Sequence, residues 1–580
     1  MLHNIETQKL QWGLSNILRS KEEKNFYSSV VASYIAYQIR LEHLESEFEK
    51  VHHNLIEFRE RITQKINQDN AYLVKNFLFE LIDEYTIRAV EFALQFDNVI
   101  LLEFILHAED EQASKNSGMY STPDSITTLA LEILDIGSDD VVIDSCSGVG
   151  TFLTAACEQQ PNAKYMGVEI SSWACGLAAL RASVLSGYIQ VEQGNVFDYQ
   201  FNEKADKAFS DFPIGLRVKS LEGTDIYEKY KMEMPVLAKG TSADWLFNYR
   251  LTELIKPNGR AVSIMSLGGL WNTLDREIRK YFLQQKKIEA IIALPSHLLA
   301  NTSIPVAMIV FGDGAKNGIR FIDATHEYVE GRRQWVLSSE NIKHIKEALT
   351  IDSAISRVVS YDEIANEDFS FAVRRYLVEK DTIKNGVEFS TIIKSIRRGV
   401  QLSASELDKK VSSVPTDVQY IVPADIQNGV IVRDLKSLCQ MEHRFERYVV
   451  ENGNLLIAKN GYPFKIAIAN VEQGKTLIAS GNLFIIELDT SSVNPLYVKA
   501  YLESEKGQAE LKNILVGSIV LSIGATQLGK VQIPLIELDK QNEIATKYLA
   551  AMDNIEYLRR KVEKAENELT EVLSVLFGED

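Results

Sequence analysis

Apolar and polar positions follow three different rhythms along this chain, and each rhythm predicts a different kind of structure. In the first 112 residues, apolar side chains recur every three or four positions, the spacing that buries one face of a helix. Helices are expected over residues 27–49, 54–66, 71–84 and 86–105. A polar stretch over residues 107–118 follows, so residues 1–112 are expected to form an N-terminal helical domain.

Residues 113–380 alternate short apolar runs with helical patterns. Seven runs have the length and composition of buried strands, over residues 141–144, 165–170, 188–192, 207–210, 260–265, 289–294 and 307–311. Strands separated by helices pair mainly in parallel, with helices on both faces of the sheet. This part is therefore expected to be a doubly wound, Rossmann-like α/β domain.

Residues 381–537 change character. Short β-like runs over residues 417–422, 454–458, 465–469 and 483–488 are punctuated by Asn-Gly and Gly-Asn turns. An α+β domain is expected here.

The chain ends in one long predicted helix, over residues 538–580. Its apolar positions alternate gaps of four and three, which is the seam of a coiled coil: Ile544, Tyr548, Ala551, Ile555, Leu558, Val562, Ala565, Leu569, Val572 and Leu576. The alternative is an amphipathic helix packed on its own domain. So long a seam exceeds what one small domain covers, which favours pairing with another helix.

Composition narrows the class of protein. With 580 residues, 46% hydrophobic and 24% charged, the chain is an ordinary globular protein of about three to four domains. No basic-then-apolar leader begins it, and its apolar runs are too short to span a bilayer. The four cysteines, at 146, 157, 175 and 439, form no CxxC pair, so neither zinc nor disulfides are indicated. A cytoplasmic protein without membrane or metal partners is expected.

Charge limits how the chain could bind nucleic acid. The net charge of −18 argues against non-specific binding as the main activity. A DNA-binding face would need a local basic cluster, such as Lys394, Arg397 and Arg398 in the third region.

The most informative chemistry follows the first predicted strand. Residues 147–150 form a glycine turn, and glycines let the backbone turn sharply while a ligand lies against it. The second strand brings Glu169, which can accept hydrogen bonds from both hydroxyls of a ribose. A nucleoside cofactor is therefore expected, although a structural turn without ligand stays an alternative. Leu153 stands where the dinucleotide-binding fingerprint has its third glycine. This argues against a dinucleotide cofactor, which stays an alternative.

Two further motifs flank this turn. Upstream, Tyr120, Thr122 and Pro123 directly precede a predicted helix, whose N-terminal N–H groups and cap hydroxyl would face a ligand. Downstream, the fourth strand runs into the turn 210–215, which contains Asp211.

In this order, Tyr-x-Thr-Pro, Asp-x-x-x-Gly-x-Gly, Gly-x-Glu and acid-x-Pro-x resemble the gamma class of amino-methylating DNA methyltransferases. Residues 242–245, 256–261, 288–295, 301–305 and 360–376 resemble the methyltransferase subunit of type I restriction–modification systems. Residues 420–426, 453–457 and 533–538 resemble one half of a type I specificity subunit, with the last helix as its spacer. The resemblance implies a seven-stranded S-adenosylmethionine-dependent core (113–380) fused to a target-recognition domain (381–537) and a coiled-coil helix (538–580).

The resemblance also implies a set of cofactor contacts. Residues expected to bind S-adenosylmethionine are, from its methionine end to its adenine, Tyr120, Thr122, Pro123, Asp144, Gly148, Gly150, Thr151, Glu169 and Asn195. Asn195 stands where the family usually has Asp, and its side-chain oxygen can still accept from the adenine amino group.

The catalytic turn departs from the family. The family has Asn, Asp or Ser, then Pro-Pro, then Tyr or Phe, whereas this chain has Asp211, Phe212, Pro213 and Ile214. Asp211 and the carbonyl of residue 212 can accept hydrogen bonds from the amino group of a flipped adenine. The aromatic ring that stacks on that base is missing at Ile214, and such a stack contributes roughly 1–3 kcal/mol.

Three interpretations stay open. The chain is an adenine-N6 DNA methyltransferase with an altered base pocket, or a regulator or scaffold that binds methyl donor and DNA without turnover, or it methylates another acceptor. A dehydrogenase on the same sheet is a more distant alternative. The expected partners are double-stranded DNA and, through the last helix, a second copy or a separate specificity or restriction subunit.

Overall fold

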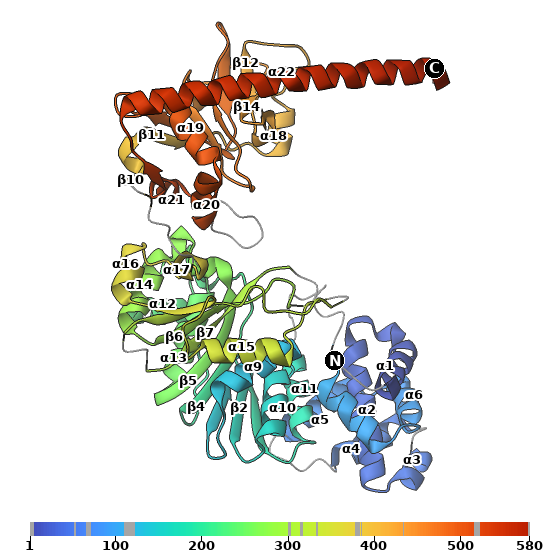
Figure 1. Cartoon of the computed structure of the whole chain (residues 1–580). Coiled ribbons are helices and arrows are strands. Elements are labelled where there is room, and N and C mark those ends of the chain that lie inside the picture. Colours follow the sequence, from blue (N-terminus) through green and yellow to red (C-terminus); the bar gives the residue numbers. More distant parts are fainter. Residues whose placement is uncertain are drawn as a thin grey trace. The chain divides into compact units, whose positions relative to one another are not determined.

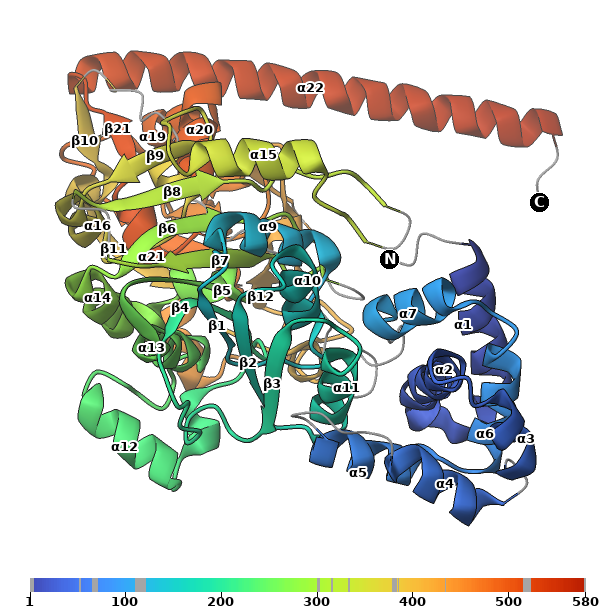
Figure 2. The ribbon, with the colours of Figure 1, turned by 90° about the horizontal axis from the view of Figure 1, so that it is seen from below.

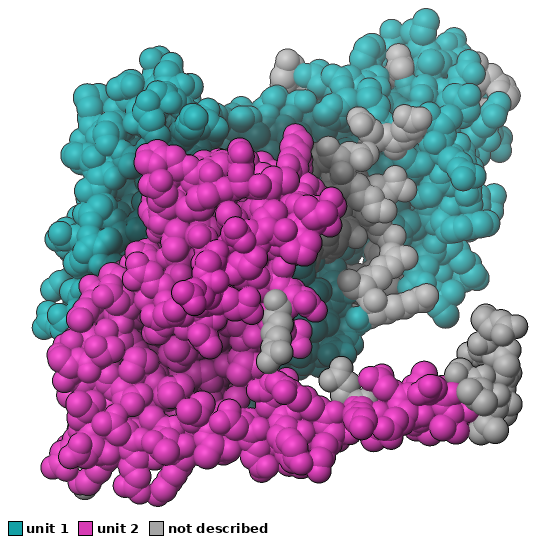
Figure 3. All heavy atoms as spheres, turned by 90° about the horizontal axis from the view of Figure 1, so that it is seen from above, with its two compact units in different colours: residues 1–377 teal, residues 378–580 magenta. Residues whose placement is uncertain are grey.

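The computed structural model describes residues 5–51, 54–64, 71–109, 122–299, 303–313, 317–331, 334–377, 383, 385–432, 434–514 and 523–577. The chain divides into two compact units, Met1–Leu377 and Val378–Asp580, shown in teal and magenta in Figure 3. The finer division into four domains stays a prediction. No helix among the described residues is both long enough and apolar enough to cross a bilayer.

Unit 1 begins with the expected helical region. Its helices are α1 (Ile5–Ile17), α2 (Asn25–Leu41), α3 (Glu45–Val51), α4 (Leu55–Gln64), α5 (Ala71–Leu81), α6 (Glu84–Ala93) and α7 (Asn98–His107). The single helix expected over 27–49 is wrong, because the chain turns at His43, whose φ is 54°. The helix expected over 86–105 is also two helices, because the Asp97 carboxylate caps α7 by accepting from the Ile100 N–H at 2.9 Å. Helix α1 was not predicted.

The centre of unit 1 is a nine-stranded sheet in the order β3-β2-β1-β4-β5-β7-β6-β8-β9, seen in Figure 2. The strands are β1 (Val141–Asp144), β2 (Lys164–Glu169), β3 (Tyr188–Gln193), β4 (Ala205–Asp211), β5 (Ile255–Ser266), β6 (Ile288–Ala293), β7 (Val306–Phe311), β8 (Ile319–Asp323) and β9 (Ser356–Val359). All seven predicted strands are present, and β8 and β9 are additional.

Strand directions bring the functional candidates to one edge. β1 runs parallel to β2 and β4, and β4 runs parallel to β5. β7 is antiparallel to both its neighbours, β5 and β6, whereas β6 is parallel to β8. The carboxyl ends of β1, β2 and β4 therefore lie side by side, which is where an open α/β sheet binds its ligand.

Helices cover both faces of the sheet, as expected for a doubly wound domain. They are α9 (Asp124–Leu134), α10 (Thr151–Gln159), α11 (Ser172–Ala182), α12 (Asp225–Glu233), α13 (Asp244–Leu254), α14 (Arg276–Gln285), α15 (Ser339–Ala348), α16 (Tyr361–Asn366) and α17 (Arg374–Leu377). One buried cluster contains Trp245 of α13 and Phe282 of α14, and a second contains Ile126 of α9 and Phe152 of α10. The two clusters are the cores of the two faces.

Arg181 joins the helical region to the sheet domain. Its guanidinium, almost fully buried, donates to the carbonyls of Ile105 at 3.0 Å, Ala108 at 2.5 Å and Val149 at 3.0 Å. Because Val149 belongs to the glycine turn, the end of α7 is fixed to the loop that follows β1.

Unit 2 contains two four-stranded sheets, in the orders β11-β20-β17-β18 and β15-β12-β19-β16, and two strand pairs, β10-β21 and β13-β14. Its strands are β10 (Gly386–Glu388), β11 (Ile393–Arg398), β12 (Val418–Ile421), β13 (Ile426–Gln427), β14 (Val430–Ile431), β15 (Lys436–Ser437), β16 (Val449–Val450), β17 (Leu455–Ala458), β18 (Ile466–Ile468), β19 (Thr476–Ala479), β20 (Leu483–Leu488) and β21 (Gln532–Pro534). Its helices are α18 (Ala404–Asp408), α19 (Pro495–Glu503), α20 (Glu505–Asn513), α21 (Ala525–Gly529) and α22 (Leu538–Phe577).

Helix α22 is 40 residues long and has two parts. Its beginning packs on unit 2, where Gln541 is fully buried and accepts from the Asn494 N–H at 2.9 Å. Further along, the predicted seam is exposed, from 41% at Ile555 to 58% at Leu569. Packing on its own domain therefore accounts for only the first turns of this helix.

Candidate functional site

Three carboxylates meet at the carboxyl edge of the sheet, one at the end of each of three adjacent strands. Asp144 ends β1, Glu169 ends β2 and Asp211 ends β4. The charges of Asp211 and Glu169 both act on Asp144, which shows that the three groups are close. Burial, reinforced by these two charges, raises the pKa of Asp144 well above its usual range. This edge of the sheet therefore favours a positively charged ligand.

The glycine turn after β1 leaves space beside its backbone. Gly148 and Gly150 have φ values of 52° and 83°, a region that L side chains rarely adopt. A Cβ on Gly150 would lie 3.0 Å from the Cβ of Ala178, so this glycine allows α10 and α11 to approach closely. A Cβ on Gly148 would meet nothing within 4 Å. The turn is thus tight on its helix side and open at Gly148.

Glu169 is fixed by the backbone on both of its oxygens. Its Oε2 accepts from the Gly148 N–H at 2.9 Å, and its Oε1 accepts from the Ser171 N–H at 2.8 Å. The residue is 8% exposed. Each carboxylate oxygen has more than one lone pair, so the side chain can still accept hydrogen bonds from a diol.

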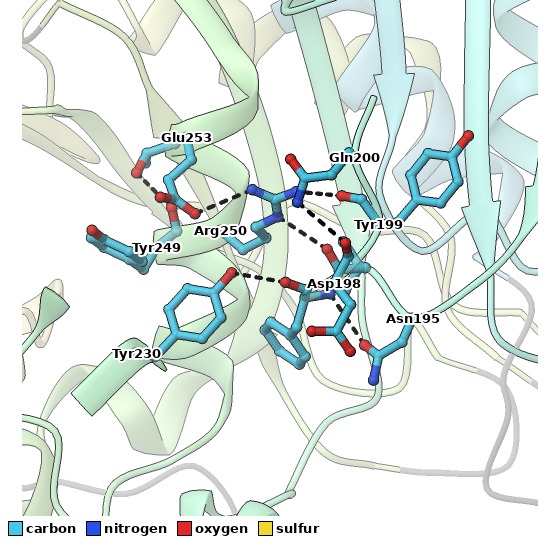
Figure 4. Close-up of polar contacts among 11 residues, drawn as sticks. Asn195, Asp198, Tyr199, Gln200, Tyr230, Tyr249, Arg250 and Glu253 are labelled. Carbon is cyan, nitrogen blue, oxygen red and sulfur yellow. Dashed lines mark hydrogen bonds and ion pairs between the residues drawn. The ribbon is translucent and has the colours of Figure 1, made fainter. Parts of the chain in front are cut away.

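Asn195 lies in the loop after β3, and Figure 4 shows how that loop is held. The Asn195 Oδ1 accepts from the Phe197 N–H at 3.1 Å. Arg250 of α13 donates through Nε to the Val196 carbonyl at 3.0 Å and through Nη2 to the Tyr199 carbonyl at 2.7 Å. Arg250 was not predicted from the sequence, because no local signal links α13 to a loop some fifty residues earlier.

The segment before α9 meets the turn after β4. The Thr122 hydroxyl donates to Asp211 Oδ2 at 2.7 Å, and Pro123 caps the N-terminus of α9. Burial raises the pKa of Asp211 to about 6, and the Thr122 hydroxyl opposes that rise. Tyr120 lies outside the described residues, so only the Thr-Pro part of this motif is placed.

The turn after β4 carries its aromatic ring inward. Phe212 is 1% exposed and stacks on Phe247 of α13, with ring centroids 4.8 Å apart and an interplanar angle of 12°. Pro213 is exposed, and Ile214 is half-buried against the cluster that contains α9 and α10. In this conformation, Phe212 offers no ring to a base beside Asp211.

Two hydroxyls that were not predicted as functional join the first and fourth strands. The Ser145 hydroxyl donates to the Ser210 hydroxyl at 2.8 Å, and the Ser145 N–H donates to the Phe209 carbonyl at 3.0 Å. This buried pair fixes the distance between the two turns that carry Asp144 and Asp211.

Thr151, the remaining predicted cofactor residue, lines a cavity, and the described residues hold no cluster of metal ligands. Thr151 is the first residue of α10 and, with Asp124, lines a cavity of about 270 Å³. Within the described ranges, no group of three or more His, Cys, Asp or Glu side chains is arranged to hold a metal ion.

A sheet with β7 antiparallel between β5 and β6, a glycine turn after β1 and a carboxylate after β2 defines the class I fold of S-adenosylmethionine-dependent methyltransferases. Residues 100–385 match the family model described as N-6 DNA Methylase. The likeness to this family therefore concerns residues 100–385, just under half of the chain.

Relatives narrow the likeness further. The chain is 23% identical over 347 residues to the type I restriction enzyme MpnII methylase subunit of Mycoplasma pneumoniae. The aligned region covers 55% of this chain and 63% of that protein. The chain thus spans less than two thirds of the length of this curated relative.

Solved structures share the fold. The methyltransferase subunit of a type I restriction–modification system from Streptococcus thermophilus superposes with a TM-score of 0.51 at 19% identity, covering 64% of this chain and 99% of that one. The type IIG restriction endonuclease BpuSI gives a TM-score of 0.51 at 12% identity and covers 94% of this chain and 74% of its own.

Proposed function

We propose that this protein is a sequence-specific DNA methyltransferase that transfers a methyl group from S-adenosylmethionine to the N6 amino group of adenine, as part of a restriction–modification-like system. The observation that carries the proposal is the placement of Asp211 beside Thr122 and Asp144, one strand away from the open glycine turn.

The residues at the sheet edge fit the proposed cofactor. The open space at Gly148 leaves room for a ligand against the backbone. Glu169, held by the N–H groups of Gly148 and Ser171, would accept from ribose hydroxyls with its remaining lone pairs. A positively charged sulfur beside Asp144 would favour its ionised carboxylate and offset the burial that raises its pKa. When bound, S-adenosylmethionine supplies a methyl group on a positively charged sulfur. Asn195 would accept from the adenine amino group of the cofactor.

On the acceptor side, Asp211 and the backbone carbonyl of Phe212 would accept hydrogen bonds from the two N–H groups of a flipped adenine. Accepting both bonds turns the nitrogen lone pair away from the ring and makes the nitrogen nucleophilic. Pro213 and Ile214 would form the wall of the base pocket. The relatives that are named as type I methylase subunits support this choice of reaction.

Double-stranded DNA is the proposed substrate, and unit 2 would recognise one half-site. The reaction would take place in the cytoplasm, where DNA and methyl donor are found together. Helix α22 would pair with a second copy of the chain, or with a separate specificity or restriction subunit, through its exposed seam.

The helix proposal is tested by truncation after Met552. This cut keeps Gln541 and Ala545, which are buried in unit 2, and removes only the exposed seam. Full-length protein should have the mass of a dimer in solution, or bind a subunit encoded beside it, and the truncated protein should do neither. A monomer that binds no partner before and after truncation would remove the pairing proposal.

The activity is tested by incubating the protein with radiolabelled S-adenosylmethionine and unmethylated genomic DNA, followed by digestion to nucleosides. Label in N6-methyladenosine, absent with Asp211→Ala, is the expected result. Tight binding of the methyl donor without transfer, even with a partner subunit present, would instead favour a regulator or scaffold. If calorimetry detects binding of neither S-adenosylmethionine nor its demethylated product, the proposed function fails.

A further inference from the structure

Two positive side chains of unit 2, Arg398 and Lys459, act on each other, and neither forms an ion pair with a carboxylate of the described residues. Arg398 ends β11, and Lys459 directly follows β17. Burial lowers the pKa of Lys459, and the charge of Arg398 lowers it further. Within the described part of the chain, no acidic side chain contributes to this shift. In a chain with a net charge of −18, such a pair is an exception.

The Arg398 side chain is held in place by neutral acceptors. Its Nε donates to the Gly481 carbonyl at 2.7 Å, and its Nη2 donates to Gln401 Oε1 at 3.0 Å. A guanidinium has five N–H donors, so these two contacts leave others for a ligand. The head group is therefore fixed in orientation, and its charge is not neutralised by these contacts.

Three chain segments build the surroundings of the pair. The Lys459 N–H donates to the Asn482 carbonyl at 2.8 Å, and the Gly481 N–H donates to the Val400 carbonyl at 2.6 Å. In the same place, the buried Asn460 Oδ1 has no hydrogen-bond partner among the residues that the structure describes. The ends of β11 and β17 and the turn before β20 thus form one supported surface around two cations.

The loop from β17 to β18 extends this surface. Tyr462 in that loop is 54% exposed, and the Lys512 ammonium lies 5.3 Å from the centre of its ring. This loop therefore adds a further positive charge, that of Lys512, to unit 2.

Lys459 is partly buried and is repelled by the exposed Arg398, and a bound anion would offset that repulsion. We infer that Arg398 and Lys459 together bind phosphate groups of the duplex DNA backbone and position unit 2 on the DNA. The inference rests on the proposed function, because it assigns that function's DNA contact to this surface. Phosphate contacts set affinity and register, whereas other residues would distinguish the bases.

The test measures binding of a fluorescent duplex of random sequence to the full-length protein over a series of salt concentrations. Each phosphate contact adds about one to the slope of log affinity against log salt. Arg398→Gln and Lys459→Gln should each lower that slope by about one and weaken binding equally for unrelated sequences. The double variant should lower it by about two. Lys547→Gln is the control, because it removes one positive charge from an exposed position on α22 that pairs with Glu543.

The outcomes separate the inference from the function on which it rests. If wild-type protein binds DNA and neither variant changes the slope, the pair is not a phosphate contact, although the proposed function stands. If wild-type protein binds no DNA at any salt concentration, the proposed function itself fails. A second arm replaces chloride with inorganic phosphate at constant ionic strength. If phosphate raises the melting temperature of wild-type protein but not of Arg398→Gln, while the DNA slopes are unchanged, the pair binds a small anion and the inference is overturned.

Discussion

The turns after β1 and after β4 occupy equivalent places in the sheet, yet one leaves open space beside its backbone and the other packs a side chain into the core. The β1 turn keeps an open space at Gly148 beside a carboxylate that the backbone orients. The β4 turn keeps its carboxylate, Asp211, but packs its aromatic ring against Phe247 inside the core. The side proposed for the cofactor thus has both shape and polar groups, whereas the side proposed for the acceptor has its polar group, and neither Phe212 nor Ile214 of its turn offers a stacking ring.

The difference shows which parts of a site depend on the backbone and which on side chains. Strand ends fix the positions of Asp144 and Asp211, and the Ser145–Ser210 hydrogen bond keeps the two turns together. An aromatic platform, in contrast, depends on one side chain and the space around it. The comparison predicts that the polar half of the acceptor site is functional and that its stacking half is weak.

The largest effect is expected from Asp211→Ala. Losing this acceptor should lower the rate of methyl transfer by about 10²- to 10⁴-fold, the range that positioned acid–base groups contribute. Binding of S-adenosylmethionine, measured by calorimetry, should weaken far less, because most of the proposed cofactor contacts lie on β1, β2 and the loop after β3, and only Thr122 loses a hydrogen-bond partner. Equal losses of transfer and cofactor binding would mean that the two turns are not separate in function.

A ring placed at position 214 should strengthen the acceptor side. Ile214→Tyr restores the residue type found in the family, and a base–aromatic stack contributes roughly 1–3 kcal/mol, or about 5- to 150-fold. The expected result is faster single-turnover transfer with unchanged cofactor affinity. Ile214→Leu is the matched control. If Tyr and Leu give the same rate, the base does not stack at this position.

The acid limb of the pH profile should report the Asp211 carboxyl. Burial raises its pKa to about 6. When the carboxyl is ionised, both of its oxygens accept hydrogen bonds, whereas protonation turns one of them into a donor. The rate of transfer should therefore be level above pH 7 and fall about tenfold per unit below pH 6. Asp211→Asn, which does not titrate, should be slow and should lack this limb. A wild-type profile that stays flat down to pH 5 would contradict the assignment.

The smallest effect concerns the loop that carries Asn195. Arg250→Lys loses one of two donors to that loop, worth about 1 kcal/mol, so KM for S-adenosylmethionine should rise roughly fivefold with kcat unchanged. A positioning role also predicts weaker discrimination between S-adenosylhomocysteine and an analogue with oxygen in place of the adenine amino group. Arg276→Lys, at a half-buried arginine of α14 that pairs with Asp368, is the control. Unchanged discrimination in Arg250→Lys would leave Arg250 a purely structural residue.

Much of the fold and part of the site were predictable because they depend on local pattern. Buried strands such as β1 and glycine turns have signatures within a few residues. β8, Ile319–Asp323, and β9, Ser356–Val359, were missed because charged and polar residues interrupt their apolar runs, whereas β1 is apolar up to its last residue. The Thr122–Asp211 contact spans 89 residues, and the burial of Phe212 depends on Phe247 from another helix. No pattern along the chain encodes contacts of that kind.

The inward packing of Phe212 also has a consequence for substitutions in this turn. Reverting this position to the proline of the family would remove a ring stacked on Phe247 and leave a void, at a cost of roughly 3–5 kcal/mol. A change at Phe247 would have to accompany the proline to refill that void. A new ring is therefore added at lower cost at the half-buried position 214 than by changing position 212.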